Sequence, residues 1–342
     1  DGMLGTGSYT DVASAVAELM EGERPEHFGD IHRTYEDGER MVTTPPYTAF
    51  LKIAEGCSNG CAFCIIPKLR GRYRSRSMEA LVEEARGLAA SGVKELIVIA
   101  QDITRYGLDR KDGSTLAKLL DRLCELDFHW IRLHYLYPEA VTDELIETIA
   151  RQPKILHYLD IPIQHCNDAI LKAMRRRNTR AEIEALFAKL RKAMPDVVLR
   201  TSLICGLPGE GEAEFEELCH FLREQRIQRA GVFQFSPEEG PLAAAMEGQV
   251  DPDTAARRVE LVVDLQSRVM DEYNEERLGT VMEVLCEGFD SAEGCYTGRT
   301  YADSPDIDGR VLFTAAGVIP AGTFVNVRIT GTEDGDLMGE IE

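Results

Sequence analysis

Three cysteines, Cys57, Cys61 and Cys64, lie within eight residues at the spacing C-x3-C-x2-C. They follow an apolar, strand-like stretch, residues 47–54, and the glycine at position 56. A loop this short can close around one inorganic cluster, and three thiolates leave one iron of a four-iron cluster without a protein ligand. The spacing therefore predicts a metal site with one open coordination position, where a small molecule can bind and react.

Three other interpretations of these cysteines carry less weight. A structural zinc needs a fourth ligand, and the nearest histidines, His32 and His129, are distant and in no zinc-like spacing. A disulfide pair is disfavoured, because nine cysteines in 342 residues without a signal segment are typical of a reducing cytosol. An electron-transfer cluster would need a complete set of cysteine ligands. The open cluster remains the favoured hypothesis.

Composition predicts a cytoplasmic protein with one large core and a smaller attached module. The chain is 44% apolar, and no apolar run approaches the roughly 20 residues that a bilayer span needs. It carries 38 basic and 59 acidic residues, a formal charge of -21. That charge disfavours nucleic acid as a partner and favours a basic protein.

From residue 47 the sequence alternates between short β-like runs and helical segments. Six units, each roughly 30 to 40 residues long, predict a parallel sheet curled into a partial (β/α)6, TIM-like barrel of the α/β class. In such a barrel the reactive groups belong at the carboxyl ends of the strands. The predicted strands cover residues 47–54, 94–100, 130–135, 158–163, 197–204 and 231–235.

Four polar or glycine-rich clusters follow these strands and are expected to meet at one mouth. They are the cysteine loop, Gln101-Asp102, Gln164-His165 and the turn that begins at Gly206. Ordinary turn residues would give the same pattern for any single cluster, so only their agreement favours a site. His165 and Cys205 could be mistaken for metal ligands, but they are interpreted as satisfied residues of the barrel mouth. The cysteines at positions 124, 166, 219, 286 and 295 show no common spacing and are interpreted as packing thiols.

The last 65 residues differ in character. Five short strands, at 281–286, 295–301, 310–313, 323–329 and 336–341, predict a small five-stranded antiparallel β-barrel similar to the oligonucleotide-binding class. Twelve acidic and three basic residues give this segment a net charge of -9. A phosphate backbone would be repelled by it, and a lysine-rich protein would be attracted.

At the other end, residues 1–46 contain no cysteine. An amphipathic helix is expected at 11–23, followed by a charged linker over 22–46. The organisation predicted is a helix and linker at 1–46, a core at 47–277 and the small barrel at 278–342.

The motifs together resemble the radical S-adenosylmethionine (SAM) methylthiotransferases that carry a C-terminal TRAM domain. The resemblance covers residues 47–342 and is strongest in the branch that modifies an aspartate of small-subunit ribosomal protein twelve. The tRNA (adenosine) branch, of the MiaB type, typically has Gly-Gln-Asn where this chain has Ala100-Gln101-Asp102. That branch is the first alternative, and a non-catalytic metal-binding adaptor is the second. The motifs are LKIAEGC at 51–57, CAFCIIP at 61–67, QDITRYG at 101–107, LDIPIQH at 159–165, LRTS at 199–202, GLPGE at 206–210 and DGDLMG at 334–339.

The resemblance implies a role for each candidate residue. The three cysteines would ligate a [4Fe-4S] cluster, and SAM would occupy its open iron. Phe63 would contact adenine, unless it only packs. Arg200 would pair with the SAM carboxylate, unless it forms a salt bridge on the sheet. Among the others, Gln101 would bind the SAM amino group, Gln164 would lie in the cofactor site, and Gly206 would let the backbone approach the ligand, although helix-entry turns also use glycine.

The family's reaction adds a methylthio group to the β-carbon of the target aspartate. It implies an electron donor such as flavodoxin or ferredoxin, and a second [4Fe-4S] cluster in an N-terminal domain that this sequence lacks. The chain by itself is therefore expected to bind and cleave SAM only. Two basic runs, residues 68–76 and 175–177, are interpreted as receiving an acidic target or that missing domain, although solvated surface is the commoner explanation.

Overall fold

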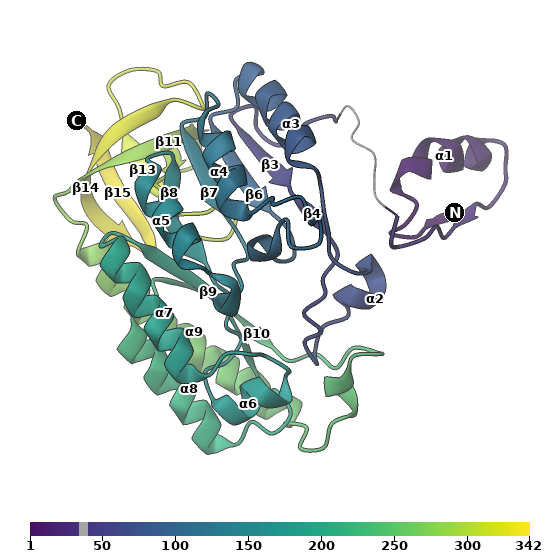
Figure 1. Ribbon diagram of the computed structural model, residues 1–342. Helices are drawn as coiled ribbons and strands as arrows, with labels where there is room; N and C mark the ends of the chain where they lie inside the picture. Colours follow the sequence, from purple (N-terminus) through teal and green to yellow (C-terminus); the bar gives the residue numbers. More distant parts are fainter. Residues whose placement is uncertain (34–39) are drawn as a thin grey trace.

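A six-stranded parallel sheet forms the centre of the computed structural model, which describes residues 1–33 and 40–342 (Figure 1). The strand order is β10-β9-β8-β7-β6-β3, and every neighbouring pair is parallel. The sheet is open, with β3 and β10 at its edges, so the predicted partial barrel is confirmed. Its strands are β3 (Thr48–Lys52), β6 (Glu95–Ile99), β7 (Trp130–Leu133), β8 (Ile155–Asp160), β9 (Val198–Cys205) and β10 (Arg229–Gln234).

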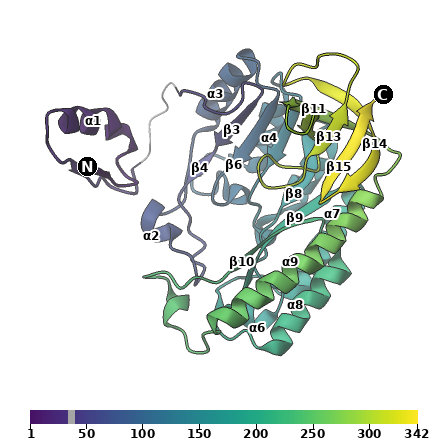
Figure 2. The same ribbon diagram turned by 180° about the vertical axis from the view of Figure 1, so that it is seen from behind.

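Helices cover the outer face of this sheet (Figures 1 and 2). In α4, Leu116, Leu119, Leu120 and Leu123 recur at helical spacing and are all buried against the sheet. The predicted capping box at Thr179 and Glu182 is present at the start of α7. The helices are α2 (Ile66–Arg70), α3 (Met78–Ala90), α4 (Leu116–Cys124), α5 (Asp143–Arg151), α6 (Asp168–Ala173), α7 (Arg180–Ala193), α8 (Glu212–Gln225) and α9 (Pro252–Glu275), with 3-10 turns η2 (Ile103–Arg105), η3 (Pro138–Ala140) and η4 (Leu242–Ala245).

The C-terminal residues form the predicted five-stranded barrel, which is closed in the order β11-β12-β13-β15-β14. Four neighbouring pairs are antiparallel, but β13 and β15 are parallel, so the expectation of a wholly antiparallel barrel is wrong at this pair. An odd number of strands cannot alternate direction all the way around a closed ring, so one pair has to be parallel. The strands are β11 (Val281–Asp290), β12 (Cys295–Arg299), β13 (Val311–Thr314), β14 (Phe324–Glu333) and β15 (Asp336–Ile341).

Buried charges join this barrel to the inner face of the parallel sheet. Arg132 donates to Glu95 at 2.9 Å within the sheet, and Arg299, from the end of β12, donates to the same carboxylate at 2.6 Å. All three side chains are at most 3% exposed. A second cross-domain pair joins Arg229 to Asp303 at 2.8 Å. The end of β12 and the loop after it therefore bury charged side chains of the sheet against the C-terminal domain.

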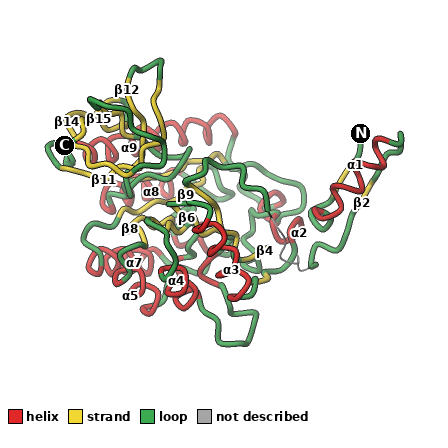
Figure 3. The backbone as a smooth tube through the Cα atoms, turned by 90° about the horizontal axis from the view of Figure 1, so that it is seen from above, coloured by secondary structure: helices red, strands yellow, loops and turns green. Residues whose placement is uncertain are grey.

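The N-terminal residues form a small unit beside α2 (Figure 3). It contains β1 (Met3–Leu4), η1 (Tyr9–Asp11), α1 (Val12–Met20) and β2 (Glu26–His27), and β1 pairs in parallel with β2. The predicted helix is present as α1, whereas β2 lies inside the expected linker. Arg70 of α2 donates to Tyr9 of this unit. The rest of the expected linker includes residues 34–39, which lie outside the described residues.

In the part of the chain that the structure describes, no helix is long and apolar enough to cross a membrane.

The Glu95→Gln variant is expected to lose about 3–5 kcal/mol of unfolding free energy, because Arg132 and Arg299 would lose their buried counter-ion. The matched control is Glu283→Gln. Glu283 also bridges the two domains, to His129 at 3.0 Å, but it is about half exposed, so that change should cost less than about 1 kcal/mol. Urea unfolding at pH 7 measures both. Equal losses in the two variants would contradict the assignment of Glu95 as the central counter-ion.

The ionisation of Glu95 should also make the unfolding free energy depend on pH. Burial opposes the ionisation of Glu95, but Arg132 and Arg299 outweigh it and lower the pKa of Glu95 to about 2. A lowered folded pKa means that the stabilisation is present above the unfolded value of 4.5 and is lost as the pH falls from there toward 2. The wild-type chain should therefore lose more unfolding free energy than Glu95→Gln between pH 5 and the acid limit. Parallel pH profiles would exclude this role.

Candidate functional site

The cysteine loop begins where the chain leaves β3 at its carboxyl end. Two short strands, β4 (Ala54–Glu55) and β5 (Arg74–Ser75), pair antiparallel and bracket the loop. Gly56 starts it with φ +76°, and a Cβ there would lie 2.3 Å from the Arg72 carbonyl oxygen. Only glycine fits this close approach. The glycine that ends the predicted strand is therefore required by backbone geometry.

The loop backbone is held from several directions. The Cys57 amide donates to the Gly71 carbonyl at 3.1 Å, and the Ala62 amide donates to the Met174 carbonyl, at the end of α6, at 3.0 Å. The Ala243 amide, from η4, donates back to the Ala62 carbonyl at 2.9 Å. These bonds fix a segment that has little regular secondary structure of its own.

The three thiols are largely enclosed. Cys57 and Cys61 are buried, and Cys64 is half-buried. Burial raises the pKa of the Cys57 thiol to about 11, and the neighbouring Cys61 and Cys64 raise it as well. Within the described residues, no three His, Cys, Asp or Glu side chains are grouped so that they could hold a single metal ion. In a four-iron cluster each thiolate binds a different iron, so its ligands stand farther apart than those of one ion.

Cys61 has two side-chain neighbours that the sequence reasoning missed. The Tyr137 hydroxyl lies 3.0 Å from Cys61 Sγ, and Arg176 Nη1 lies 3.9 Å from the same sulfur. The Arg176 guanidinium stacks over the Tyr137 ring at 4.2 Å. Tyr137 follows β7, so the rule that site residues follow strand ends could have found it. Arg176 gave no such signal.

The segment that follows β6 contacts the loop through Asp102. This fully buried carboxylate accepts from Asn59 Nδ2, in the cysteine loop, at 2.9 Å and from the Thr104 amide at 3.0 Å. Two buried acceptor atoms, Oδ1 of Asn59, which donates to Asp102, and Oε1 of Gln101, which precedes it, have no hydrogen-bond partner within the described protein. Buried polar atoms normally have partners. These two oxygens could therefore accept hydrogen bonds from a ligand that carries N–H groups.

Two other candidates lie near the same edge with packing or backbone roles of their own. Phe63 packs against an apolar cluster formed by Ala62, Ile170, Met174, Leu207 and Ala243. Gln164 leaves β8 with φ +70°, a conformation that few non-glycine residues adopt. Its backbone pairs with the end of β9 through Ser202 and Ile204. Contact of either side chain with a cofactor stays a prediction.

Arg200 lies on the inner face of the sheet between two carboxylates. Its Nη1 donates to Asp160 at 2.9 Å, and its Nε is 3.7 Å from Asp308 of the C-terminal domain. Burial raises the pKa of Tyr135, and its backbone amide donates to the same Asp160 carboxylate at 3.3 Å. The charge of Arg200 is already compensated by Asp160 and Asp308. To pair with a SAM carboxylate, Arg200 would have to give up one of these two partners.

Gly206 is required for a reason that the sequence did not reveal. Its φ is +82°, and a Cβ there would lie 2.4 Å from the Cβ of Ala255 in α9. Its amide donates to the buried Glu210 carboxylate at 3.0 Å, which also accepts from Arg258 at 2.9 Å. His165 Nε2 lies 3.5 Å from the same carboxylate. The turn is therefore a packed junction with α9, and approach of its backbone to a ligand stays a prediction.

The two basic runs are partly used inside the protein. Arg74 is buried and donates to the Arg72 carbonyl at 2.6 Å, and Arg76 pairs with Glu84 at 2.7 Å. Arg176 is only 6% exposed, so its interpretation as a receiving surface is wrong. Its neighbours Arg175 and Arg177 are exposed, and for them that interpretation stays a prediction.

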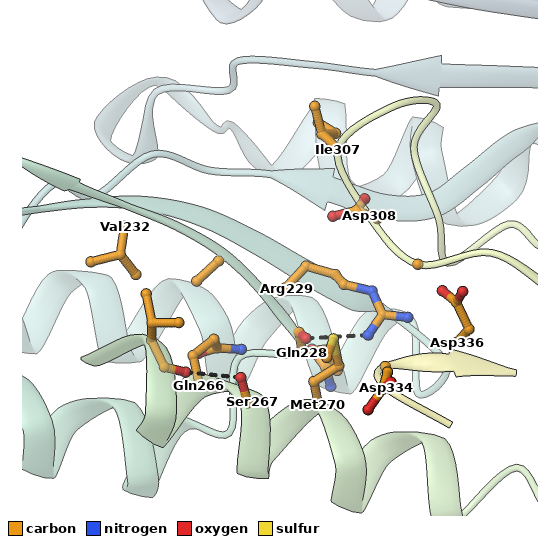
Figure 4. Close-up of a pocket in the computed structure, with 14 residues that line it drawn as sticks. Gln228, Arg229, Val232, Gln266, Ser267, Met270, Ile307, Asp308, Asp334 and Asp336 are labelled. Atoms are coloured by element: carbon orange, nitrogen blue, oxygen red, sulfur yellow. Dashed lines mark hydrogen bonds between the residues drawn. The ribbon is translucent and has the colours of Figure 1, made fainter. Parts of the chain in front are cut away.

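A pocket of about 280 Å³ lies away from the cysteine loop, between β10, α9 and loops of the C-terminal barrel (Figure 4). Arg229, Gln266, Met270 and Asp308 are among its lining residues. Among the described lining residues, none was a candidate site residue from the sequence, although residues 334–336 belong to the DGDLMG motif. The pocket belongs to the contact between the two domains.

Comparison with known proteins agrees with this architecture. Residues 51–222 match the Radical SAM superfamily and residues 278–341 match the TRAM domain. Two solved radical SAM structures share the fold, each with a TM-score of 0.51. The methyltransferase TsrM from Kitasatospora setae is 13% identical, covering 67% of this chain and 50% of its own. Coproporphyrinogen III oxidase HemN from Escherichia coli is 14% identical, covering 76% and 68%. The chain is a radical SAM protein with a TRAM domain.

Curated relatives narrow the family. The chain is 45% identical to the ribosomal protein uS12 methylthiotransferase RimO of Caldanaerobacter subterraneus subsp. tengcongensis. The match covers 99% of this chain and 78% of the relative. The protein of that name from Pelobacter propionicus is 46% identical, over 100% and 77%. The chain belongs to the RimO family of radical SAM methylthiotransferases. Membership of the radical SAM family implies a [4Fe-4S] cluster and SAM as cofactors.

The Gly206→Ala variant is expected to lose about 3 kcal/mol of unfolding free energy, because the new methyl group both strains the backbone and clashes with Ala255. The double variant with Ala255→Gly should recover the clash component. Gly60→Ala is the control, since Gly60 also has a positive φ but open space around its Cβ position. Chemical unfolding of the wild type, Gly206→Ala, Ala255→Gly, the double variant and the Gly60→Ala control measures the coupling. Additive losses would contradict the packing explanation.

Proposed function

We propose that this chain holds a [4Fe-4S] cluster through Cys57, Cys61 and Cys64, binds SAM at the remaining iron, and acts as an aspartate methylthiotransferase on ribosomal protein uS12. One observation carries the proposal: three enclosed thiols follow the carboxyl end of β3, with the unpartnered oxygens of Asn59 and Gln101 in the loop and after the neighbouring strand. Thiolates suit iron, and free acceptors suit the amino groups of SAM.

The residues present fit these cofactors. When bound, the cluster and SAM would supply reductive cleavage of SAM and a 5'-deoxyadenosyl radical able to remove hydrogen from an unactivated carbon. The chain's own residues orient and shield this chemistry. Gln101 would accept from the SAM amino group, and buried side chains such as Ile103 and Tyr137 would exclude water. Phe63, Gln164, Arg200 and Gly206 remain proposed cofactor neighbours.

The charge of the C-terminal domain supports a basic protein as substrate. Its three arginines are all paired with carboxylates: Arg299 with Glu95, Arg310 with Asp336 and Arg328 with Glu342. Five acidic side chains are exposed and have no ion pair within the described chain, namely Glu293, Asp306, Glu333, Asp334 and Glu340. The exposed surface is therefore acidic and would attract a basic ribosomal protein. It would repel tRNA, the substrate of the alternative branch.

The remaining parts of the proposal follow from the family. They are a cytoplasmic location, a one-electron donor such as flavodoxin or ferredoxin, and a second [4Fe-4S] cluster, for which this chain has no cysteine ahead of Cys57. We assign the N-terminal helix and linker to residues 1–46, the radical SAM core to 47–277 and the TRAM domain to 278–342.

Anaerobic reconstitution with iron and sulfide, followed by SAM and a reductant, tests the proposal in two stages. The wild-type chain should release 5'-deoxyadenosine, detected by mass spectrometry. Cys57→Ala should abolish this release and lose iron, because two thiolates cannot hold the cluster in place. Cys124→Ala, a half-buried thiol on α4, should keep both. A colourless protein that never cleaves SAM would instead support a metal-binding adaptor.

The substrate is tested by incubating uS12 or tRNA with the reconstituted chain, alone and with the protein that supplies the second cluster. We expect binding to uS12 that weakens with salt, and a methylthio mass increment on an aspartate of uS12 only when the second cluster is supplied. Methylthiolated tRNA, or equal affinity for both substrates, would overturn the substrate assignment.

A further inference from the structure

The three cysteine sulfurs differ in what donates to them. Burial raises the pKa of the Cys57 and Cys64 thiols, and the backbone of Asn59 and of Ile66, respectively, acts to lower it. Cys61 instead has the Tyr137 hydroxyl at 3.0 Å and the Arg176 guanidinium at 3.9 Å. Either atom of the Cys61–Tyr137 contact can donate while Cys61 is a thiol, but a cluster-bound thiolate has no proton, so the Tyr137 hydroxyl would then be the donor. Of the three, Cys61 is therefore the sulfur with side-chain donors, and a side-chain donor can be removed by substitution.

Arg176 is held near this sulfur by two further contacts. Its Nη2 donates to the Pro162 carbonyl, beyond the end of β8, at 2.7 Å, while its guanidinium stacks on the Tyr137 ring. The flanking Arg175 and Arg177 are exposed, so the chain turns only the central arginine of the run inward. A buried arginine is costly unless its charge is used or compensated. Its Nη1 is directed at Cys61, where a bound cluster would place negative charge.

Hydrogen bonds and positive charge at a cluster's ligand sulfurs favour its reduced form, because reduction adds negative charge to the cluster and its thiolates. We propose that Tyr137 and Arg176 are positioning residues that act on Cys61 and raise the reduction potential of the [4Fe-4S] cluster. One external electron then reduces the cluster more readily, with no covalent bond made or broken in that step. The inference rests on the proposed function, because it requires Cys61 to be a cluster ligand.

Tyr137→Phe is the sharpest test, because it removes one oxygen atom. Tyr106→Phe is its control: Tyr106 is also buried in a segment that follows a strand, and its hydroxyl donates to the Arg76 carbonyl at 3.1 Å rather than to a sulfur. A redox titration of each reconstituted protein, followed by electron paramagnetic resonance, gives the midpoint potential. Tyr137→Phe should shift it to a more negative value, and Tyr106→Phe should leave it unchanged.

Variants of Arg176 test the same inference independently of Tyr137. Arg176→Gln removes the charge and should lower the midpoint potential, Arg176→Lys should recover part of the shift, and the exposed Arg177→Gln should have no effect. Resonance Raman spectra provide a second readout, because losing a donor to a thiolate should raise an Fe–S stretching frequency. Iron and sulfide contents are measured for every variant, so a variant that fails to assemble is identified and the other arm decides.

The outcomes distinguish a failure of the roles of Tyr137 and Arg176 from a failure of the proposed function. If the wild-type chain assembles a four-iron cluster that responds to SAM, but Tyr137→Phe and Arg176→Gln keep its potential and Raman spectrum, this inference fails and the proposed function stands. If the wild-type chain assembles no cluster, both fail. A shift in Tyr106→Phe equal to that in Tyr137→Phe would show a general packing effect and would also overturn the inference.

Discussion

The external fixation of one irregular loop is the constraint on which the rest of the structure depends. Residues 56–65 have no helix or strand of their own, so their shape is set by bonds to neighbouring segments. Cys57 is bonded to Gly71, Ala62 to Met174 and Ala243, and Asn59 to Asp102. These partners belong to segments far apart in the sequence, which a parallel sheet with its connections at one edge brings together. Such fixation places thiols accurately without a regular element.

Charge compensation explains why the two domains form one body. The six-stranded sheet is open, and two of its buried charges, Glu95 and Arg229, have their partners in the C-terminal domain. Arg299, at the end of β12, and Asp303, in the loop after it, each pair with an oppositely charged residue of the sheet. Arg200 and Asp308 approach each other across the same boundary. The TRAM domain therefore contributes buried groups to the core that carries the cysteine loop.

Local signals in the sequence were enough to predict the elements and the cysteine loop. Apolar runs ending at glycine or polar residues predicted all six strands, and the capping box at Thr179 and Glu182 marked the start of α7. The barrel's single parallel pair was missed, although it follows from its odd strand number. Strand β2 was missed because two residues carry too little pattern to predict.

The long-range contacts could not be predicted. Arg176 meets a sulfur 115 positions earlier in the chain, and Arg299 meets Glu95 across 204 positions. Nothing near either residue in the sequence indicates its partner. At Gly206 the sequence suggested only ligand approach, and the structure adds a second reason for glycine, the close contact with Ala255. Composition and spacing specify which residues can react, and the fold decides which of them meet.

The central claim is that three thiols leave one iron of the cluster open to SAM. Electron paramagnetic resonance of the reconstituted, reduced chain, recorded before and after addition of SAM, tests it most directly. We predict the signal of a reduced four-iron cluster, and a changed signal once SAM binds to it. A protein that shows no four-iron signal, or one whose signal is the same with and without SAM, would contradict the account.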